Sequence, residues 1–149
     1  KRYDLLNNYQ VNHIDKYNEL GISSLPHQVI VFDEFADFIL SNKKNKERIE
    51  SAIKKLCWKA RAAGIHLILS TQRPAKDIVT GVIKASLPAK IAFKTSTVSN
   101  SQIVIENNSA YKLFGKGDML LSKEWSLTRV QWAFISDWEL DAVIEKLAN

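Results

Sequence analysis

Residues 27–34 read HQVIVFDE, four apolar side chains followed directly by two acids. A short apolar run bounded by polar residues is typical of a strand that is buried on both faces of a sheet. Residues 66–74, HLILSTQRP, repeat the pattern and end in a polar cluster. The sequence therefore predicts two buried strands, over residues 27–33 and 66–71, each with polar side chains at its carboxyl end.

Helical patterns lie between and after these strands. Apolar residues recur three or four positions apart over residues 43–63, and Gly64 follows as a stop signal. Residues 77–86 predict a short helix with Asp77 as its N-cap, and residues 89–95 predict a third strand. Further along, we expect a helix over 98–106, two antiparallel strands over 119–122 and 129–135 around a connection at 123–128, and a helix over 137–147 capped by Ser136.

Buried strands that alternate with helices predict an α/β fold with a mainly parallel sheet flanked by helices and an antiparallel C-terminal strand pair. Residues 1–25 read as a helix and a connector, and residues 26–149 as the main domain. The length of 149 residues and the 46% apolar content fit one globular domain or a piece of a larger one. Because the chain begins with Lys1 rather than Met, we expect a piece of a longer protein.

The charge is distributed unevenly. The net charge is +5, but residues 43–94 carry 13 basic and 3 acidic side chains, a balance of +10. Such a segment suits a polyanionic partner, or it solvates the exposed face of one helix, and the sequence leaves both open. No apolar run approaches the roughly 18 residues of a membrane span. A single cysteine, Cys57, excludes an internal disulfide framework, and we expect it to pack as a small apolar group.

Three polar clusters follow the predicted strands: Asp33-Glu34, residues 71–73 and residues 95–97. Ligands of parallel sheets gather at the carboxyl ends of the strands, so we expect these clusters to lie together. In a nucleoside triphosphatase the first acid lies near Mg²⁺ and the second polarises the attacking water. The alternative is that Asp33 only caps a helix over residues 34–40.

Two further side chains fit phosphoryl transfer. Gln72 could hydrogen-bond a γ-phosphate, and Arg61 could either cap helix carbonyls or project into a neighbouring subunit. No glycine begins the phosphate-binding motif G-x-x-x-x-G-K-[ST]. The three histidines and Cys57 do not have the spacing of zinc ligands. We expect His66, which opens a predicted buried strand, to be an interior histidine whose hydrogen bonds are satisfied.

Several motifs together carry a resemblance to a known family. They are DEFAD (33–37), KARAAGIH (59–66), TQRP (71–74), TGVIKA (80–85) and GKGDML (115–120). With their flanking residues, they resemble the motor domain of the FtsK/SpoIIIE DNA translocases over nearly the whole chain. The resemblance implies a fragment of a RecA-like P-loop NTPase core, from a hexameric ATPase that uses ATP and Mg²⁺ to pump double-stranded DNA. Many such proteins are tethered to the cytoplasmic side of the bacterial inner membrane, and here the tether would lie outside the chain.

The resemblance also implies roles for individual residues. Asp33 would lie in the Mg²⁺ shell, Glu34 would be the general base, Gln72 would read the γ-phosphate and Arg61 would act on a neighbouring subunit. The candidates for DNA contact are Arg73, Lys76, Lys84 and Gln102.

In the family the phosphate-binding loop lies upstream of residue 1, so we expect the fragment alone to be inactive. We also expect it to rearrange or to associate through the strand edges that the missing strand leaves open. Two alternatives stay open: a conjugation coupling or secretion ATPase of the same superfamily, and a non-catalytic DNA-binding or ring-interaction module derived from such a motor.

Overall fold

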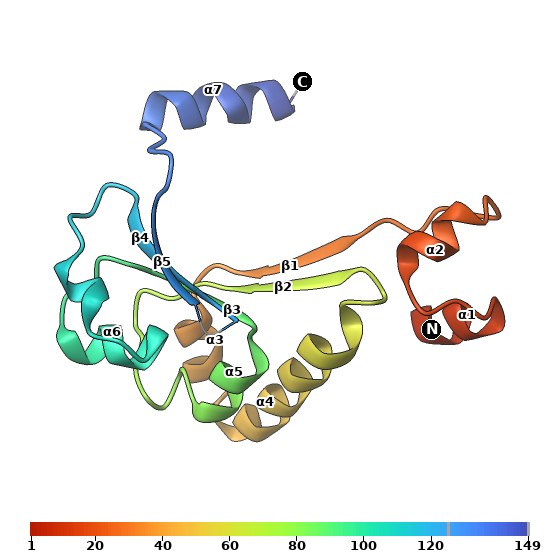
Figure 1. Ribbon diagram of the computed structural model, residues 1–149, viewed down its shortest axis with the longest axis horizontal. Helices are drawn as coiled ribbons and strands as arrows, with labels where there is room; N and C mark the ends of the chain where they lie inside the picture. Colours follow the sequence, from red (N-terminus) through yellow and green to blue (C-terminus); the bar gives the residue numbers. More distant parts are fainter. Residues whose placement is uncertain (125, 149) are drawn as a thin grey trace. The chain divides into compact units, whose positions relative to one another are not determined.

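The computed structural model describes residues 1–124 and 126–148, which form two compact units divided between Leu87 and Pro88 (Figure 1). The first unit contains α1 (Arg2–Asn8), α2 (Ile14–Glu19), β1 (Gln28–Phe32), α3 (Phe35–Ser41), the 3₁₀ turn η1 (Lys43–Asn45), α4 (Lys46–Lys55), the π-helical turn η2 (Leu56–Ala60), β2 (Ile65–Leu69) and α5 (Gly81–Ser86). The second contains β3 (Ala89–Phe93), α6 (Val98–Ile105), the 3₁₀ turn η3 (Ser109–Lys112), β4 (Asp118–Lys123), β5 (Ser126–Gln131) and α7 (Asp137–Ala148).

In the first unit β1 and β2 form a two-stranded parallel sheet, with Gln28 opposite Ile65 and Phe32 opposite Leu69. The two strands lie where the apolar runs predict them. Helices α3, α4 and α5 cover one face of the sheet and contribute Phe35, Ile53 and Ile83 to the buried core (Figure 1). Phe32, Leu67 and Leu69 of the strands pack against this core. The covered face therefore follows the alternation of side chains along each strand.

The prediction that β1 and β2 are buried on both faces is wrong. Val29 and Val31 are 58% and 60% exposed, and Ile68, opposite Val31, is 51% exposed. These side chains share the face that α3, α4 and α5 do not cover. Among the residues that the structure describes, nothing buries them.

The predicted helices of this unit differ in detail from the observed ones. The helix expected over residues 43–63 is divided into the 3₁₀ turn η1, α4 and the π-helical turn η2. Cys57 packs against the core, as expected. The helix expected over 77–86 begins only at Gly81, because Thr80, not Asp77, accepts the capping hydrogen bond from the Ile83 amide at 3.4 Å. The chain before Thr80 forms a turn instead.

The N-terminal helices are tied to the sheet by Arg2 and by a group of histidines. The Arg2 guanidinium donates to the carbonyls of Pro26 and Ala63 at 3.0 and 2.9 Å. His66 is exposed because it lies on the uncovered face of the sheet. Its predicted interior position is therefore wrong. Its Nε2 is 3.1 Å from His27 Nδ1, and His27 Nε2 is 3.1 Å from Asp15 Oδ1.

In the second unit β3, β4 and β5 form an antiparallel sheet in that order. The antiparallel C-terminal pair is confirmed, although β5 begins at Ser126 and ends at Gln131 rather than spanning 129–135. The expectation that the third strand joins the parallel pair is wrong, since β3 pairs with β4. Residue 125, inside the expected connection, lies outside the described residues.

The helices α6 and α7 lie where the sequence predicts them. At the start of α7, the amide and the hydroxyl of Ser136 both donate to Glu139 Oε2, at 2.9 and 2.6 Å. The core of this unit contains Ala92, Ile105, Ala110, Leu113 and Leu120. In the part of the chain that the structure describes, no helix combines the length and the apolar character that a membrane crossing needs.

Candidate active site

The carboxyl ends of β1 and β2 are held together by backbone hydrogen bonds beyond the strands. The Ser70 amide donates to the Phe32 carbonyl at 2.9 Å, and the Phe35 amide donates to the Ser70 carbonyl at 2.8 Å. These bonds extend the ladder to the points where Asp33-Glu34 and residues 71–73 leave the sheet. Two of the three predicted polar clusters therefore lie side by side, as the parallel pairing requires.

Glu34 is the centre of this edge of the sheet. Its Oε1 accepts hydrogen bonds from the Ala36 amide at 3.0 Å and from the Thr71 hydroxyl, and its Oε2 accepts one from the Gln72 amide at 2.7 Å. The bond from Ala36 makes Glu34 the N-cap of α3. The alternative in which Asp33 caps a helix over residues 34–40 is wrong, since the helix begins at Phe35 and the preceding side chain caps it.

These contacts stabilise the ionised carboxylate. Burial of the group favours its neutral form, but the hydrogen bonds from Thr71, Gln72 and Ala36 and the nearby charge of Arg73 outweigh this effect. The pKa of Glu34 consequently lies below its ordinary value. The side chain is half-buried, so one part of the carboxylate still faces solvent.

Asp33 is exposed beside Glu34 and supplies oxygen atoms, the ligands that Mg²⁺ prefers. No three His, Cys, Asp or Glu side chains gather into a metal site in residues 1–124 and 126–148. Mg²⁺ commonly keeps several waters and binds through one or two carboxylates together with substrate phosphates. A single exposed carboxylate at this edge fits such an ion.

The segment after β2 contacts Glu34 through its backbone and through one hydroxyl group. Gln72 is exposed, and the bond to Glu34 comes from its backbone amide. The Arg73 amide donates to Thr71 Oγ1 at 3.1 Å. Thr71 was only part of a polar cluster in the sequence, and no pattern distinguished it from its neighbours. Its contact with Glu34 appears once the two strands pair in register.

Arg61 lies at the other end of the sheet. It follows η2 and precedes β2, whereas Glu34 follows β1. Because the strands are parallel, Arg61 lies near their amino ends and Glu34 near their carboxyl ends, separated by a strand length of about 15 Å. The Arg61 side chain is exposed, and its carbonyl accepts a hydrogen bond from Gly64 at 3.0 Å. Arg61 therefore does not join Glu34 within one chain.

The candidates for DNA contact are divided between the units. Arg73 lies close enough to Glu34 to influence its pKa, exposed Lys76 lies in the turn before α5, and Lys84 lies half-buried on α5. Gln102 is exposed on α6 in the second unit. The third polar cluster, residues 95–97, is also in that unit, where Thr97 caps α6. Its predicted place beside Asp33 followed from the parallel pairing of β3, which is not observed.

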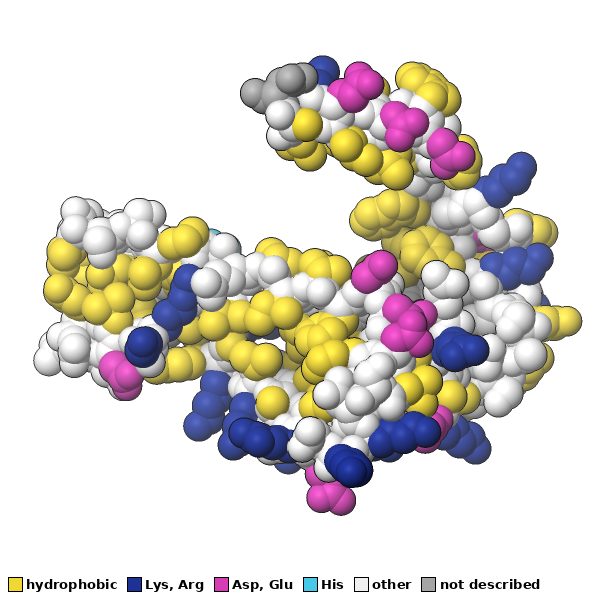
Figure 2. All heavy atoms as spheres, turned by 180° about the vertical axis from the view of Figure 1, so that it is seen from behind, with side chains coloured by type: hydrophobic (Ala, Val, Ile, Leu, Met, Phe, Trp, Pro, Cys, Tyr) yellow, Lys and Arg dark blue, Asp and Glu magenta, His cyan; other side chains and the backbone are white. Residues whose placement is uncertain are grey.

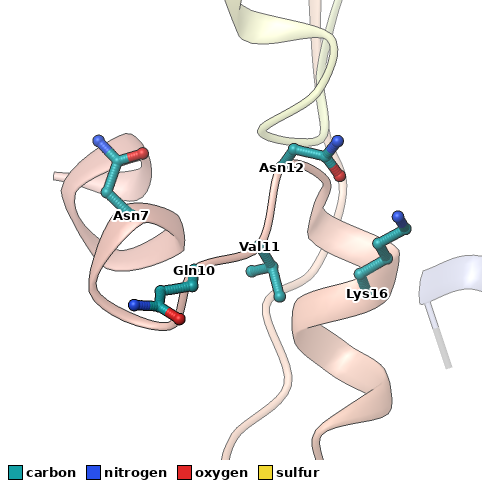
Figure 3. A pocket seen from close by; sticks show the side chains of 5 residues that line it. All are labelled: Asn7, Gln10, Val11, Asn12 and Lys16. Carbon is teal, nitrogen blue, oxygen red and sulfur yellow. The ribbon is translucent and has the colours of Figure 1, made fainter.

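Two other surface features accompany this site. Figure 2 shows Lys and Arg side chains gathered along the side of the first unit that α4 forms. Those that are exposed there include Lys44, Arg48, Lys54, Lys55 and Lys59. A separate open pocket of about 330 Å³ lies between α1 and α2 and is lined by Asn7, Gln10, Val11, Asn12 and Lys16 (Figure 3). The pocket contains none of the predicted site residues.

Comparison with known proteins finds similar sequences and similar folds. The sequence model of the FtsK/SpoIIIE family matches residues 21–76. The DNA translocase FtsK of Borreliella burgdorferi is 41% identical over 155 residues, which cover 99% of this chain and 19% of that protein. The DNA translocase FtsK of Clostridium tetani is 44% identical over 151 residues, covering 97% of this chain and 20% of that protein. The chain thus spans about a fifth of the length of these relatives.

Solved structures agree on the fold. The monomer of the pCW3 conjugation coupling protein TcpA, solved with ATPγS, matches 99% of this chain and 45% of its own, with a TM-score of 0.81 and 28% identity. The cytoplasmic domain of the type VII secretion ATPase EccC of Thermomonospora curvata matches with a TM-score of 0.77 and 24% identity, which supports the fold alone. The predicted class, an α/β fragment of a RecA-like P-loop ATPase core, is confirmed.

Proposed function

The chain is related to the FtsK/SpoIIIE family, and we propose that it is part of an ATP-driven motor that translocates double-stranded DNA in chromosome or plasmid segregation or transfer. The observation that carries the proposal is the contact of Glu34 with the segment after β2. With the parallel pairing of β1 and β2, it brings Asp33-Glu34 and Gln72 to the same end of the sheet, and this supports a role in phosphoryl transfer, which depends on the positioning of such groups.

Each residue at this edge has a proposed role. Asp33 would lie in the water shell of a Mg²⁺ ion, and the bound ion would neutralise the charge of the phosphates. Glu34 would accept the proton of the attacking water, and Gln72 would hydrogen-bond the γ-phosphate. The exposed position of Asp33 and the half-buried, ionised state of Glu34 support this division of roles.

Arg61 would complete the site of a neighbouring subunit. Its position at the opposite edge from Glu34 and its exposed side chain support a role in trans. An arginine supplied by a partner stabilises the charge of the phosphoryl-transfer transition state. The proposal therefore includes assembly of the full-length protein into a ring. The resemblance to the family implies that this ring is a hexamer.

The partner would be the DNA backbone. Arg73, Lys76, Lys84 and Gln102 are the proposed contacts, and binding to phosphates would be independent of sequence. Because Arg73 lies next to the Glu34 network, a DNA contact there would be close to the hydrolytic residues. We propose a cytoplasmic location, on the cytoplasmic side of the bacterial inner membrane if the full-length protein is tethered there.

The 149 residues supply one half of an ATP site. None of the glycines in the sequence begins a phosphate-binding loop motif, whose amides and lysine hold the phosphates. We therefore propose that these residues alone do not hydrolyse ATP and that the phosphate-binding half comes from another segment of a longer chain.

The variant Glu34→Gln in the full-length protein tests the proposed function. It should lower kcat for ATP at least about a hundredfold, because general-base catalysis contributes on this order. It should leave nucleotide affinity within about threefold of wild type, since removal of the base alone does not remove the phosphate contacts. The control is Glu47→Gln, which neutralises an exposed acid in the first turn of α4 and should leave kcat unchanged. Retained turnover of Glu34→Gln would contradict the assignment.

The second candidate is a conjugation coupling or secretion ATPase of the same superfamily, which would keep the ATPase activity and move a different cargo. The match to a conjugation coupling protein at 28% identity favours it. Stimulation of the full-length ATPase by linear duplex DNA, and not by a secreted protein substrate, separates the first candidate from a secretion ATPase. A third candidate, a non-catalytic DNA-binding or ring-interaction module, predicts DNA binding or ring assembly without any ATP turnover.

A further inference from the structure

Thr71 makes a contact that none of the proposed roles includes. It lies two residues beyond the end of β2 and is half-buried. Its hydroxyl donates to Glu34 Oε1 and accepts a hydrogen bond from the Arg73 amide at 3.1 Å. A carboxylate cannot donate, so the only proton of the hydroxyl is directed at Glu34. The contact joins the ends of two strands that are 37 positions apart in the sequence.

The hydroxyl also makes the two oxygens of Glu34 unequal. Each carboxylate oxygen has two acceptor sites. Oε1 uses both, one for the Ala36 amide and one for Thr71. Oε2 has a single donor among the described residues, the Gln72 amide at 2.7 Å. The second acceptor site of Oε2 is therefore the one left for a water molecule.

We infer that Thr71 is a positioning residue for Glu34: its hydroxyl occupies Oε1, fixes the orientation of the carboxylate and leaves Oε2 to face the attacking water. The inference rests on the proposed function, because it assumes that Glu34 acts on water. It adds a residue whose effect passes through Glu34.

The two amide donors do not replace the hydroxyl. The Ala36 amide belongs to α3 and the Gln72 amide to the segment after β2, and each holds a different oxygen. Without Thr71, Oε1 gains a free acceptor site, and both oxygens compete for the same water. A misplaced catalytic group lowers the rate of the chemical step more than the binding of substrate.

The test uses two variants of the full-length protein. Thr71→Val keeps the branched shape and removes the hydroxyl, and it should lower kcat about tenfold, a part of what a general base contributes. The KM for ATP should stay within about twofold, because the phosphate contacts are intact. Thr71→Ser keeps the hydroxyl and should restore kcat to within about threefold of wild type.

The matched control is Thr80→Val. The Thr80 hydroxyl also donates to a glutamate, Glu50 Oε1 at 3.1 Å, and Thr80 is likewise half-buried in the first unit. Thr80→Val also removes the N-cap of α5, so it should lower the melting temperature, but it should not lower kcat, because no catalytic group is involved.

The results separate three cases. A lowered kcat with an unchanged KM, restored by serine, supports the inference. An unchanged kcat in Thr71→Val, a parallel loss of kcat and ATP affinity, or no restoration by serine overturns it. If Glu34→Gln abolishes turnover while Thr71→Val does not lower it, only this inference fails. If Glu34→Gln keeps turnover, the proposed function fails as well.

Discussion

Asp118 shows how a single residue can stabilise a turn between elements. It is buried at the start of β4 and accepts hydrogen bonds from Arg129 Nε and Nη2 at 2.8 and 2.6 Å and from the Phe114 amide at 2.7 Å. The Arg129 guanidinium also lies 5.0 Å from the centre of the Phe114 ring. The hydrogen bonds from Arg129 and Phe114 lower the pKa of Asp118 from 3.8 to about 2.

This pKa predicts an acid-sensitive contribution to stability. A carboxylate whose pKa is lowered by folding stabilises the protein above its unfolded pKa, and the contribution disappears as the pH falls towards the folded value. Asp118→Asn should therefore be less stable than wild type at pH 7, and the difference should shrink between pH 3.8 and about 2. Urea unfolding of both proteins across this range measures it. A difference that stays constant would contradict the prediction.

At the level of residues, the sequence predicted the positions at the strand ends better than the contacts between them. The apolar runs identified Asp33, Glu34 and Gln72 as strand-end residues, because a run of apolar residues ends just before each polar cluster. The alternative of a helix cap named Asp33, whereas Glu34 caps α3, since both acids are adequate caps and only backbone geometry separates them. Thr71 could not be identified, because its partner is distant in sequence.

Among the elements, α6 has a single N-cap residue, Thr97, at its start. Thr97 Oγ1 accepts a hydrogen bond from the Asn100 amide at 3.1 Å, and the side chain of Ser96 accepts one only from the Asn100 side chain, also at 3.1 Å. Thr97→Ala should lower the free energy of unfolding by about 1 kcal/mol, because it leaves a helix amide without its acceptor. Ser96→Ala, the control, should have a much smaller effect. Equal effects in chemical denaturation would show that the cap is not the cause.

The existence of most elements could be predicted, and their ends could not. Periodic apolar residues indicate α4, α6 and α7 because a helix must bury one face. The helix expected over 43–63 has helical spacing throughout, and the π-helical turn at Leu56–Ala60 has no sequence signal of its own. The start of α5 depended on a competition between Asp77 and Thr80 as caps, which the turn before Thr80 decides.

The whole molecule leaves apolar strand surface uncovered. Both β1 and β2 pair with only one strand among the described residues, and Val29, Val31 and Ile68 share an exposed face. Open strand edges with apolar side chains favour association. We predict that the isolated 149-residue chain associates in solution and that Val31→Lys shifts it towards monomer. Light scattering at several concentrations measures this.

The control for association is Leu147→Lys. Leu147 is 82% exposed on α7 and lies outside the sheet, so its replacement should leave the oligomer unchanged. A monodisperse wild-type monomer would contradict the predicted association. Equal effects of both variants would show that general apolar exposure, rather than the β1–β2 sheet, is responsible.

Only part of the strand pairing could be predicted from the sequence. The parallel neighbours β1 and β2 agree with the helices that connect them, because parallel strands need a long crossover connection, which is usually helical. The pairing of β3 with β4 depends on residues that are about 30 positions apart, such as Ile91 and Leu121. Apolar runs alone do not reveal that partner. The sequence therefore indicated the first sheet correctly and assigned β3 to the wrong one.

The histidines have a practical consequence. His13, His27 and His66 are all the histidines of the sequence, and they lie around Asp15 where α2 meets the strands. The rings of His27 and His66 stack with their centres 5.4 Å apart. Ring-current shifts depend on such stacking. The imidazole proton resonances of His27 and His66 are thus a natural reporter of whether the amino ends of β1 and β2 are paired, without any introduced label.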